Sequence, residues 1–267
     1  MPLDVEAKVI RNTRLSSDYN VIALAAPEIA ATVAPGQFVM VKPGRGNDPL
    51  LRRPFSVFEI LRENGHVTGL TLLSKRVGVT TRMLLEAVEG DVVSCLGPLG
   101  KPFEPVDPPA EAWMVAGGVG LAPFATLTEV LVARGTPTTL FYGARSGREL
   151  FYLDWFATRG VRLVLTTEDG STGERGRVTA PLERELQRAT GSVTVYACGP
   201  EPMLEAVAHV STKYGRRSQV SVERVMGCGM GGCYSCVIPM KDKIGGQHYV
   251  RSCIGGPVFD GAALVWD

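Results

Sequence analysis

Four of the six cysteines of this 267-residue chain lie in its last fifth, and their spacing restricts the fold more than any other feature. Cys228, Cys233, Cys236 and Cys253 form a C-x4-C-x2-C run followed, after sixteen residues, by a fourth cysteine. This pattern is typical of the ligands of plant-type [2Fe-2S] clusters. The glycines between residues 227 and 232 permit a tight loop and let amide groups approach the anionic sulfurs. We therefore predict that these four cysteines bind an iron–sulfur cluster.

Other cysteine sites fit this spacing less well. A structural zinc site usually pairs two C-x2-C turns, and only Cys233 and Cys236 form such a turn. A thioredoxin-type redox pair would not have two further cysteines beside it, and a Rieske centre needs two histidines where only His248 is near. Zinc remains open as the alternative. Cys95 lies in an apolar segment and is expected to be a buried structural thiol.

The composition is that of a globular protein, and it argues against several classes of partner. The chain is 45% hydrophobic and 21% charged with a net charge of +1, so nothing indicates binding to nucleic acid or to an anionic membrane. No apolar run approaches the roughly 20 residues of a membrane span. The first residues include acidic side chains and lack the apolar core of a signal peptide. We therefore expect a cytoplasmic location and no membrane association.

The first 104 residues contain short apolar segments that predict a small antiparallel barrel. These segments are rich in Val, Ile, Leu and Phe and are bounded by Gly, Pro, Asn or Asp. The six expected strands cover residues 7–10, 19–25, 37–42, 55–60, 66–73 and 91–96. One helix is expected at about 81–88, with Thr80 as its N-cap and Gly90 just past its end. This pattern is typical of a six-stranded β-barrel.

After a proline-rich linker at 100–109, strand and helix signals alternate, which predicts a parallel sheet with helices on both faces. The expected strands cover 113–116, 139–142, 162–166, 193–197 and 219–222. The expected helices cover 123–133, 150–158, 178–187 and 202–214. The roughly 50 residues that remain are too few for an independent core without a metal. We therefore predict three domains: a β-barrel at 1–104, an α/β nucleotide-binding domain at 105–218 and a cluster domain at 219–267.

Two motifs in the predicted barrel suit a phosphate-bearing cofactor. Arg53-Pro-Phe-Ser56 begins a strand, and Val77-Gly-Val-Thr-Thr81 opens the helix. An arginine can bind a diphosphate through its planar fork, and a helix N-terminus is a ready anion site. Either motif alone is weak evidence, because Arg-Pro is common and Thr-Thr is a routine N-cap.

Together with the order of the three domains, these motifs resemble the ferredoxin–NADP reductase superfamily. In that family a six-stranded barrel binds FAD through an arginine–aromatic–serine motif and a Gly-x-x-Ser/Thr turn. The resemblance assigns FAD contacts to Arg53, Pro54, Phe55, Ser56, Gly78, Thr80 and Thr81. Phe55 replaces the more frequent tyrosine, so a hydroxyl contact is lost while ring packing can remain. The turn Gly97-Pro-Leu-Gly100 matches the family's turn that leaves the barrel.

A glycine turn, Ala116-Gly-Gly-Val-Gly-Leu-Ala-Pro123, joins the first predicted parallel strand to its helix and suits a diphosphate. Proline stands where the usual fingerprint has its third glycine, as in the Gly-x-Gly-x-x-Pro turn of the same superfamily. Tyr196–Met203 resembles that family's Cys-Gly-Pro-x-x-Met motif, which implies a catalytic Cys198 beside the nicotinamide. The alternative for Cys198 is a buried thiol at a strand end. The nucleotide-binding residues implied are Gly117, Gly118, Gly120, Pro123, Cys198, Gly199 and Pro200.

The residues after the third predicted parallel strand favour NAD over NADP. Glu168 and Asp169 stand where related NADP enzymes have serine and arginine for the 2′-phosphate. Carboxylates would repel that phosphate but can accept hydrogen bonds from a ribose hydroxyl. Arg145 is the counter-evidence, unless it is simply a solvated charge.

These features imply a relay in which NADH exchanges a hydride with FAD and the cluster passes single electrons onward. Over essentially the whole chain the sequence resembles the electron-transfer subunits of NAD-dependent, class 1B dihydroorotate dehydrogenases. The resemblance includes the run Glu-Arg-x-Met-x-Cys-Gly-x-Gly-x-Cys at Glu223–Cys233. It implies a partner subunit with FMN that oxidises dihydroorotate to orotate for pyrimidine biosynthesis, within a heterotetramer.

Two alternatives remain open from the sequence. One is an NAD(P)H–ferredoxin or hydrogenase-linked flavoprotein subunit of the same superfamily, and the other is a nucleotide-binding regulator with structural zinc. Glu223 and Arg224 lie just before the cluster loop, where they could tune the cluster or cap the fold, and the sequence does not decide between these roles.

Overall fold

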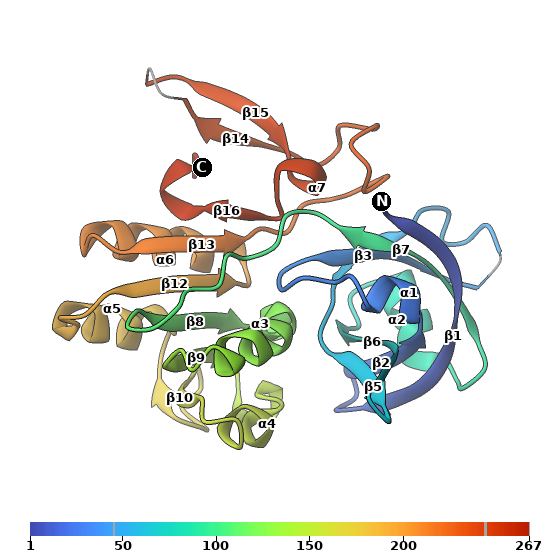
Figure 1. Ribbon diagram of the computed structural model, residues 1–267, viewed down its shortest axis with the longest axis horizontal. Helices are drawn as coiled ribbons and strands as arrows, with labels where there is room; N and C mark the ends of the chain where they lie inside the picture. The colour runs from blue at the N-terminus through green and yellow to red at the C-terminus, as the bar shows by residue number, and fades with distance from the viewer. Residues whose placement is uncertain (45, 243–244, 267) are drawn as a thin grey trace.

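Two large sheets organise the chain in this computed structural model, which describes residues 1–44, 46–242 and 245–266 (Figure 1). The first sheet is antiparallel and has the strand order β4-β3-β7-β1-β2-β6-β5. Its strands are β1 (Leu3–Arg14), β2 (Tyr19–Ala25), β3 (Phe38–Pro43), β4 (Arg53–Ser56), β5 (Ile60–Glu63), β6 (His66–Lys75) and β7 (Val92–Leu99). Two helices accompany it, α1 (Pro27–Ala30) and α2 (Val79–Glu86).

The two edges of this sheet come from one continuous segment, residues 53–63. The amide of Val57 donates to the carbonyl of Gln37 beside β3 (3.2 Å), and the amide of Phe58 donates to the carbonyl of Thr71 in β6 (2.9 Å). The segment therefore connects both edges and closes the sheet around an apolar core. The predicted antiparallel barrel is confirmed with one difference: the strand expected at 55–60 is divided into β4 and β5, so that the described sheet has seven strands.

The second sheet is parallel, as predicted, except for its last strand, and has the order β11-β10-β9-β8-β12-β13-β16. Its strands are β8 (Glu111–Gly117), β9 (Thr138–Ala144), β10 (Arg162–Thr167), β11 (Glu174–Arg175), β12 (Val193–Cys198), β13 (Arg217–Ser221) and β16 (Val258–Asp260). Helices cover both faces: α3 (Ala122–Ala133), α4 (Leu153–Ala157), α5 (Thr179–Arg188) and α6 (Glu201–Lys213).

The central strand β8 explains why this sheet forms. Its five middle residues are all buried, which is the pattern of a parallel strand covered on both faces. Met114 packs with Phe124 of α3 in one apolar core, whereas Trp113 packs with Leu182 of α5 in the other. Successive side chains of a strand point to opposite faces, so β8 contributes to two cores at once.

The C-terminal segment adds a hairpin and rejoins the parallel sheet. β14 (Val237–Lys241) pairs with β15 (Gln247–Arg251), and the short helix α7 (Ser252–Gly255) follows. β16 then pairs antiparallel with β13, so the segment around the cysteines is attached to the nucleotide sheet rather than separate from it. The division into domains at residues 104 and 218 stays a prediction.

The barrel and the parallel sheet are held together by aromatic contacts and by the linker. Phe58 of the barrel meets Tyr152 edge-on with 4.7 Å between ring centroids, and the hydroxyl of Tyr19 donates to Glu149 Oε2 (3.0 Å). The hydroxyl of Tyr196 in β12 binds both the carbonyl of Glu104 (2.9 Å) and the amide of Val106 (3.0 Å). The proline-rich linker is therefore fastened to the sheet. Within the described ranges, no helix combines the length and the apolar character needed to cross a membrane.

Candidate functional site

Two glycine turns meet at the carboxyl edge of the parallel sheet. One follows β8 and the other follows the neighbouring strand β12, so both turns open at the same edge. A Cβ on Gly120 would lie 2.1 Å from the carbonyl oxygen of Cys198, and a Cβ on Gly199 would lie 3.0 Å from the amide nitrogen of Gly117. These positions require glycine because backbone faces backbone. Parallel sheets bind nucleotides at this edge.

The structure brings the predicted nucleotide-binding residues together here. Gly118 has φ +55° and open space at its Cβ position, so its backbone is accessible to a ligand. Pro123 lies in the first turn of α3, where a missing amide hydrogen costs nothing. Pro200 immediately precedes α6 and packs against Gly117, with 2.8 Å from its Cδ to the Cβ position of that glycine.

Cys198 ends β12 beside Ser221, the residue opposite it in β13. Burial raises the pKa of its thiol to about 12, a shift opposed by a hydrogen bond from Ser221 and reinforced by the charge of Glu223. The thiol is therefore protonated at neutral pH. Because only a thiolate is a good nucleophile, this environment suits packing or orientation of a ligand rather than attack on it.

The two carboxylates predicted to select NAD follow β10. The Asp169 carboxylate accepts hydrogen bonds from the amide (2.9 Å) and the hydroxyl (2.6 Å) of Ser171, and these bonds lower its pKa. Glu168 is exposed and is anchored through its amide, which donates to the carbonyl of Ala144. Burial raises the pKa of Tyr19 in the barrel and Arg145 opposes that rise, so Arg145 lies within electrostatic range of the barrel.

The predicted flavin motifs lie on the barrel. β4 pairs with β3, the ring of Phe55 packs against the barrel core, and Ser56 faces Phe38 across the pair. The exposed Arg53 guanidinium donates to the carbonyls of Leu51 (3.0 Å) and Arg52 (3.1 Å), contacts that a stronger anionic partner can replace.

The hydroxyl of Thr81 is hydrogen-bonded within the turn that precedes α2. Thr81 Oγ1 accepts hydrogen bonds from the amides of Val77 (2.8 Å) and Gly78 (3.0 Å), so this side chain caps the helix from inside the turn. Thr80 is buried, and the helix begins two residues earlier than predicted, so that Gly78 is the N-cap in place of Thr80. Val77 is 79% exposed, so the turn opens toward solvent and is accessible to a ligand.

The four clustered cysteines form two pairs of thiols. Cys228 lies within hydrogen-bonding range of Cys233, and Cys236 within that range of Cys253, while Cys228 also acts electrostatically on Cys253. The second pair is buried, whereas Cys228 is half-buried and Cys233 is exposed. Among the described residues, no group of three or more Cys, His, Asp or Glu side chains could hold a metal ion. Four cysteine thiols are the number of ligands that a [2Fe-2S] cluster needs.

The buried pair lies against the barrel. Cys236 and Cys253 share a small apolar core with Phe38, Met40, Leu96, Leu99 and Met226, four of which come from β3 and β7. Gly229 has φ +73° and approaches so closely that a Cβ there would lie 2.6 Å from Met40 Cγ. The loop is thus seated on the barrel with one pair of thiols inward and the other outward.

The outward pair is hydrogen-bonded within its own loop. The amide of Met230 donates to Cys228 Sγ (3.4 Å), and Ser235 Oγ lies 3.2 Å from Cys233 Sγ. The Ser235 contact lowers the pKa of Cys233 to about 6, while burial raises the pKa of Cys253 to about 12. Ser235 was not predicted as a site residue, although its position between two ligands was a signal.

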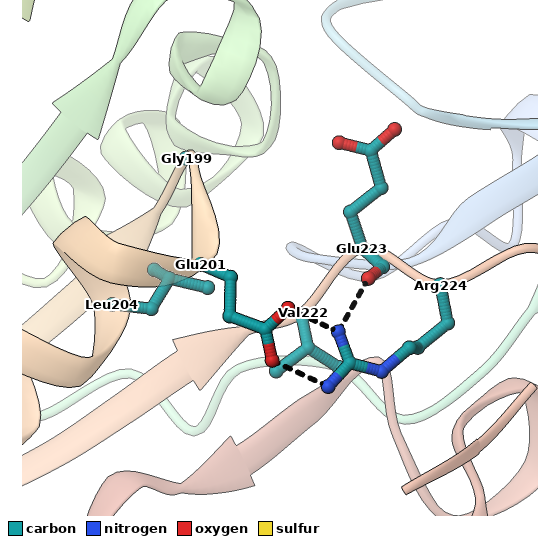
Figure 2. A pocket seen from close by; sticks show the side chains of 6 residues that line it. All are labelled: Gly199, Glu201, Leu204, Val222, Glu223 and Arg224. Carbon is teal, nitrogen blue, oxygen red and sulfur yellow. Dashed lines mark hydrogen bonds and ion pairs between the residues drawn. The ribbon is translucent and has the colours of Figure 1, made fainter. Parts of the chain in front are cut away.

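A second missed feature is an ion pair beside a cavity of about 180 Å³ (Figure 2). Arg224 binds Glu201 through two hydrogen bonds, to Oε2 (2.8 Å) and to Oε1 (2.5 Å). Glu201 is the first residue of α6, directly after the turn at Cys198, and Arg224 leads into the cluster loop. Figure 2 shows the Glu223 carboxylate pointing away from this pair. A pair 23 residues apart leaves no local spacing that could predict it.

Comparisons with known proteins agree with this arrangement. Residues 114–209 match the family described as the oxidoreductase NAD-binding domain. Residues 223–265 match the iron-sulfur cluster binding domain of dihydroorotate dehydrogenase B.

Relatives that match over most of their length are electron transfer subunits of the same enzyme. The electron transfer subunit of dihydroorotate dehydrogenase B (NAD(+)) from Desulforamulus reducens is 34% identical over 98% of both chains. The corresponding subunit from Lysinibacillus sphaericus is 38% identical over 87% of both chains.

Solved structures share the fold. A chain of the NADH-dependent reduced ferredoxin-NADP oxidoreductase, studied for flavin-based electron bifurcation, superposes with a TM-score of 0.85 at 26% identity, over 98% of this chain and 91% of that one. A ferredoxin NADP+ reductase from Neisseria gonorrhoeae with bound FAD and NADP gives a TM-score of 0.64 at 18% identity, over 79% and 92%, which shows the fold alone. The chain belongs to the family of electron transfer subunits of the NAD-dependent dihydroorotate dehydrogenase B, an oxidoreductase.

Proposed function

We propose that this chain passes electrons between NAD(H) and a separate FMN-containing catalytic subunit, through FAD and one [2Fe-2S] cluster. The reaction served is the oxidation of dihydroorotate to orotate, with electrons running from FMN through the cluster and FAD to NAD in a heterotetramer. The relatives' name supports the reaction, since each is an electron transfer subunit of dihydroorotate dehydrogenase B (NAD(+)).

The observation that carries this proposal is the two-sided placement of the four cysteines. Cys236 and Cys253 are buried against barrel strands β3 and β7, and β3 is the neighbour of the strand with Arg53 and Phe55. Cys228 and Cys233 face outward. A centre held by these thiols would have one side toward the flavin-binding barrel and the other toward a partner.

The chain's own residues hold and orient the cofactors in this proposal. Arg53 and the turn at Gly78 bind the FAD diphosphate, and the ring of Phe55 packs against the flavin. The turns at Gly118 and Gly199 bind the nicotinamide nucleotide at the sheet edge, with the neutral Cys198 thiol beside the ring. When bound, FAD supplies the exchange between hydride transfer and single-electron transfer.

The partner is expected to cover an open hollow of about 630 Å³ beside Cys228. The barrel contributes Leu50 and the cluster loop contributes Met230 to its lining. These two side chains are 73% and 57% exposed, and such apolar surface beside a redox site is typical of a subunit contact.

Reconstitution tests the function. The purified chain is mixed with the FMN subunit, dihydroorotate and NAD, and NADH formation is followed by absorbance. We expect NADH only when both subunits are present, while this chain alone passes electrons from NADH to a dye. If no NADH appears although the FMN subunit alone reduces a dye with dihydroorotate, the proposed pairing is wrong.

A matched pair of variants locates the contact. Leu50→Glu places a charge in the hollow and should weaken subunit association by at least about tenfold, because a buried unpaired charge is costly. Val132→Glu changes an exposed valine on α3, 43% accessible, and should leave association unchanged. Equal effects of the two variants would show that the partner docks elsewhere.

The preference for NAD is tested separately. Glu168 and Asp169 should make the chain prefer NADH over NADPH in dye reduction, since they repel a 2′-phosphate. Replacing them with Ser and Arg should narrow the preference. A wild-type protein that prefers NADPH would overturn this assignment.

The NADH-dependent ferredoxin-NADP oxidoreductase likeness supports a second candidate, in which the chain exchanges electrons with a ferredoxin-type partner. The same reconstitution separates the two: transfer to ferredoxin without any response to the FMN subunit would favour this second function.

A further inference from the structure

Ser235 lies between two of the proposed cluster ligands, and its side chain is engaged on two sides. Its Oγ accepts a hydrogen bond from the amide of Gly227 (2.9 Å) and lies 3.2 Å from Cys233 Sγ. A Cβ added to Gly227 would lie 3.2 Å from Cys233 Sγ and 3.5 Å from Ser235 Oγ. The amide, the hydroxyl and the sulfur therefore form one close-packed contact.

The direction of the contact between hydroxyl and sulfur follows from proton counting. A serine hydroxyl has one hydrogen to donate and two lone pairs to accept with. The Gly227 amide can only donate, so it occupies a lone pair and leaves the hydroxyl hydrogen free. A cysteine sulfur that binds iron has lost its proton. Ser235 must then donate to Cys233.

We propose that Ser235 is a positioning residue that holds the Cys233 sulfur and raises the reduction potential of the cluster. The inference rests on the [2Fe-2S] centre of the proposed function. A donated hydrogen bond stabilises negative charge on sulfur, and the reduced form of a cluster has one more negative charge than the oxidised form. The bond is therefore stronger in the reduced form, which makes reduction easier.

The location gives this bond a functional consequence. Cys233 belongs to the outward pair of thiols, on the side where the partner is proposed to dock. A higher potential moves electrons toward the cluster and away from FAD at equilibrium. Ser235 thus influences how electrons are shared between the two cofactors within this chain.

The test compares Ser235→Ala with Ser235→Thr and Tyr234→Phe in the full chain loaded with FAD and cluster. The midpoint potential is measured by redox titration followed by EPR. Ser235→Ala should make the cluster potential more negative. We expect the ratio of reduced to oxidised cluster at equilibrium with FAD to fall about tenfold, which corresponds to about 59 mV for a one-electron couple. Ser235→Thr keeps the hydroxyl and should keep the potential.

Tyr234→Phe is the matched control. It removes a hydroxyl from the adjacent residue of the same loop, on a ring that stacks with Arg251 at 4.7 Å rather than on the sulfur. Its potential should equal that of the wild type. A wild-type potential in Ser235→Ala, or an equal shift in Tyr234→Phe, would overturn the proposal.

Cluster retention gives a second readout that does not depend on the potential. Removing a partner of a metal ligand typically weakens metal binding by about 10–100-fold. Ser235→Ala should therefore release iron to a chelator about tenfold faster than the wild type, and Ser235→Thr should not. If the alanine variant cannot be loaded while the other two can, the holding role is supported; equal release rates would contradict it.

Failure of this inference is distinguishable from failure of the proposed function. A wild-type chain without the visible and EPR signals of a [2Fe-2S] centre would remove the proposed function itself. A normal wild-type cluster with unaltered potential and retention in Ser235→Ala would remove only the role of Ser235.

Discussion

The nucleotide turns and the cluster loop are both rich in glycine, but glycine serves different ends in the two regions. At the sheet edge, Gly120 and Gly199 allow backbone to lie against backbone, which fixes the turns relative to one another. In the cluster loop, Gly229 and Gly231 have φ values of +73° and +81° and let the loop curl against side chains, among them Met40 of the barrel. In the first region the neighbouring strands β8 and β12 position the turns. In the second region the loop packs against side chains of the barrel and of α7.

The pKa values of the cysteine thiols also differ between the two regions. Burial raises the pKa of Cys198 to about 12, whereas hydrogen bonds from Ser235 lower the pKa of Cys233 to about 6. The sheet edge keeps its thiol neutral, whereas Ser235 favours a thiolate at Cys233, which is the form that binds iron. Burial also raises the pKa of the inward Cys253 to about 12, so within the loop this effect belongs to the outward side.

The largest expected effect compares two equally buried cysteines. Cys236 and Cys95 are 2% and 0% exposed, but only Cys236 has another thiol beside it. Cys236→Ser should abolish the visible absorption of the cluster, because an iron loses a ligand. Cys95→Ser should keep that absorption and lower only thermal stability, since Cys95 packs in the barrel core. Equal bleaching in both variants would end the distinction between ligand and packing cysteines.

The close packing of the two nucleotide turns is tested next. Gly120→Ala places a Cβ 2.1 Å from the Cys198 carbonyl oxygen, and neither backbone can yield without moving its strand. We expect a loss of about 1–3 kcal/mol in the free energy of unfolding and at least about a tenfold rise in KM for NADH. Denaturant unfolding and dye-reduction kinetics measure the two effects.

Gly191→Ala is the control for this substitution. Gly191 lies before β12, at the opposite end of that strand, and a Cβ there meets nothing within 4 Å. Its stability should stay within about 0.5 kcal/mol of the wild type, with an unchanged KM. A Gly120→Ala protein that behaves like this control would show that the two turns are not packed as described.

The protonation of Cys198 predicts a smaller effect, on how the free energy of unfolding changes with pH. Its pKa is raised, so the fold favours the neutral thiol. The resulting stability is complete below the ordinary pKa of about 8.5 and is lost as pH rises toward 12. The stability difference between wild type and Cys198→Ala should stay constant from pH 6 to 8 and change above pH 9. The pH profile of dye reduction should keep its shape in the variant, and a profile that loses a step near neutral pH would show a titrating Cys198.

The sequence predicted what depends on spacing within one segment. Local patterns in the chain marked most of the barrel strands, the turn from Gly117 to Pro123 and the set from Cys228 to Cys253. The division of residues 53–63 into β4 and β5 could not be predicted, because both barrel edges are required to define it. The pairing of β16 with β13 was missed because three residues leave almost no strand signal. The contact of Gly227 with Ser235 depends on how the cluster loop folds back on itself. The contact of Arg224 with Glu201 depends on how separate segments of the chain meet.

The smallest expected effect concerns the Arg224–Glu201 pair, which links the two regions compared above. The side chains are 25% and 48% exposed, so solvent screens the pair and its contribution to stability should be about 0.2–1 kcal/mol. The control is Arg184–Glu174, which also forms two hydrogen bonds, 3.2 Å and 2.7 Å, but lies between α5 and β11. Arg184→Ala removes a solvent-screened pair and should leave electron transfer unchanged. Arg224→Ala should in addition slow electron transfer from NADH to the cluster. The substitution breaks the ion pair that ties the start of α6, next to the turn at Gly199, to the loop at Cys228. Rapid-mixing absorbance of cluster reduction measures this rate, with NADH-to-FAD transfer recorded in the same trace. If neither variant alters cluster reduction, the nucleotide turns and the cluster loop are positioned independently of this ion pair.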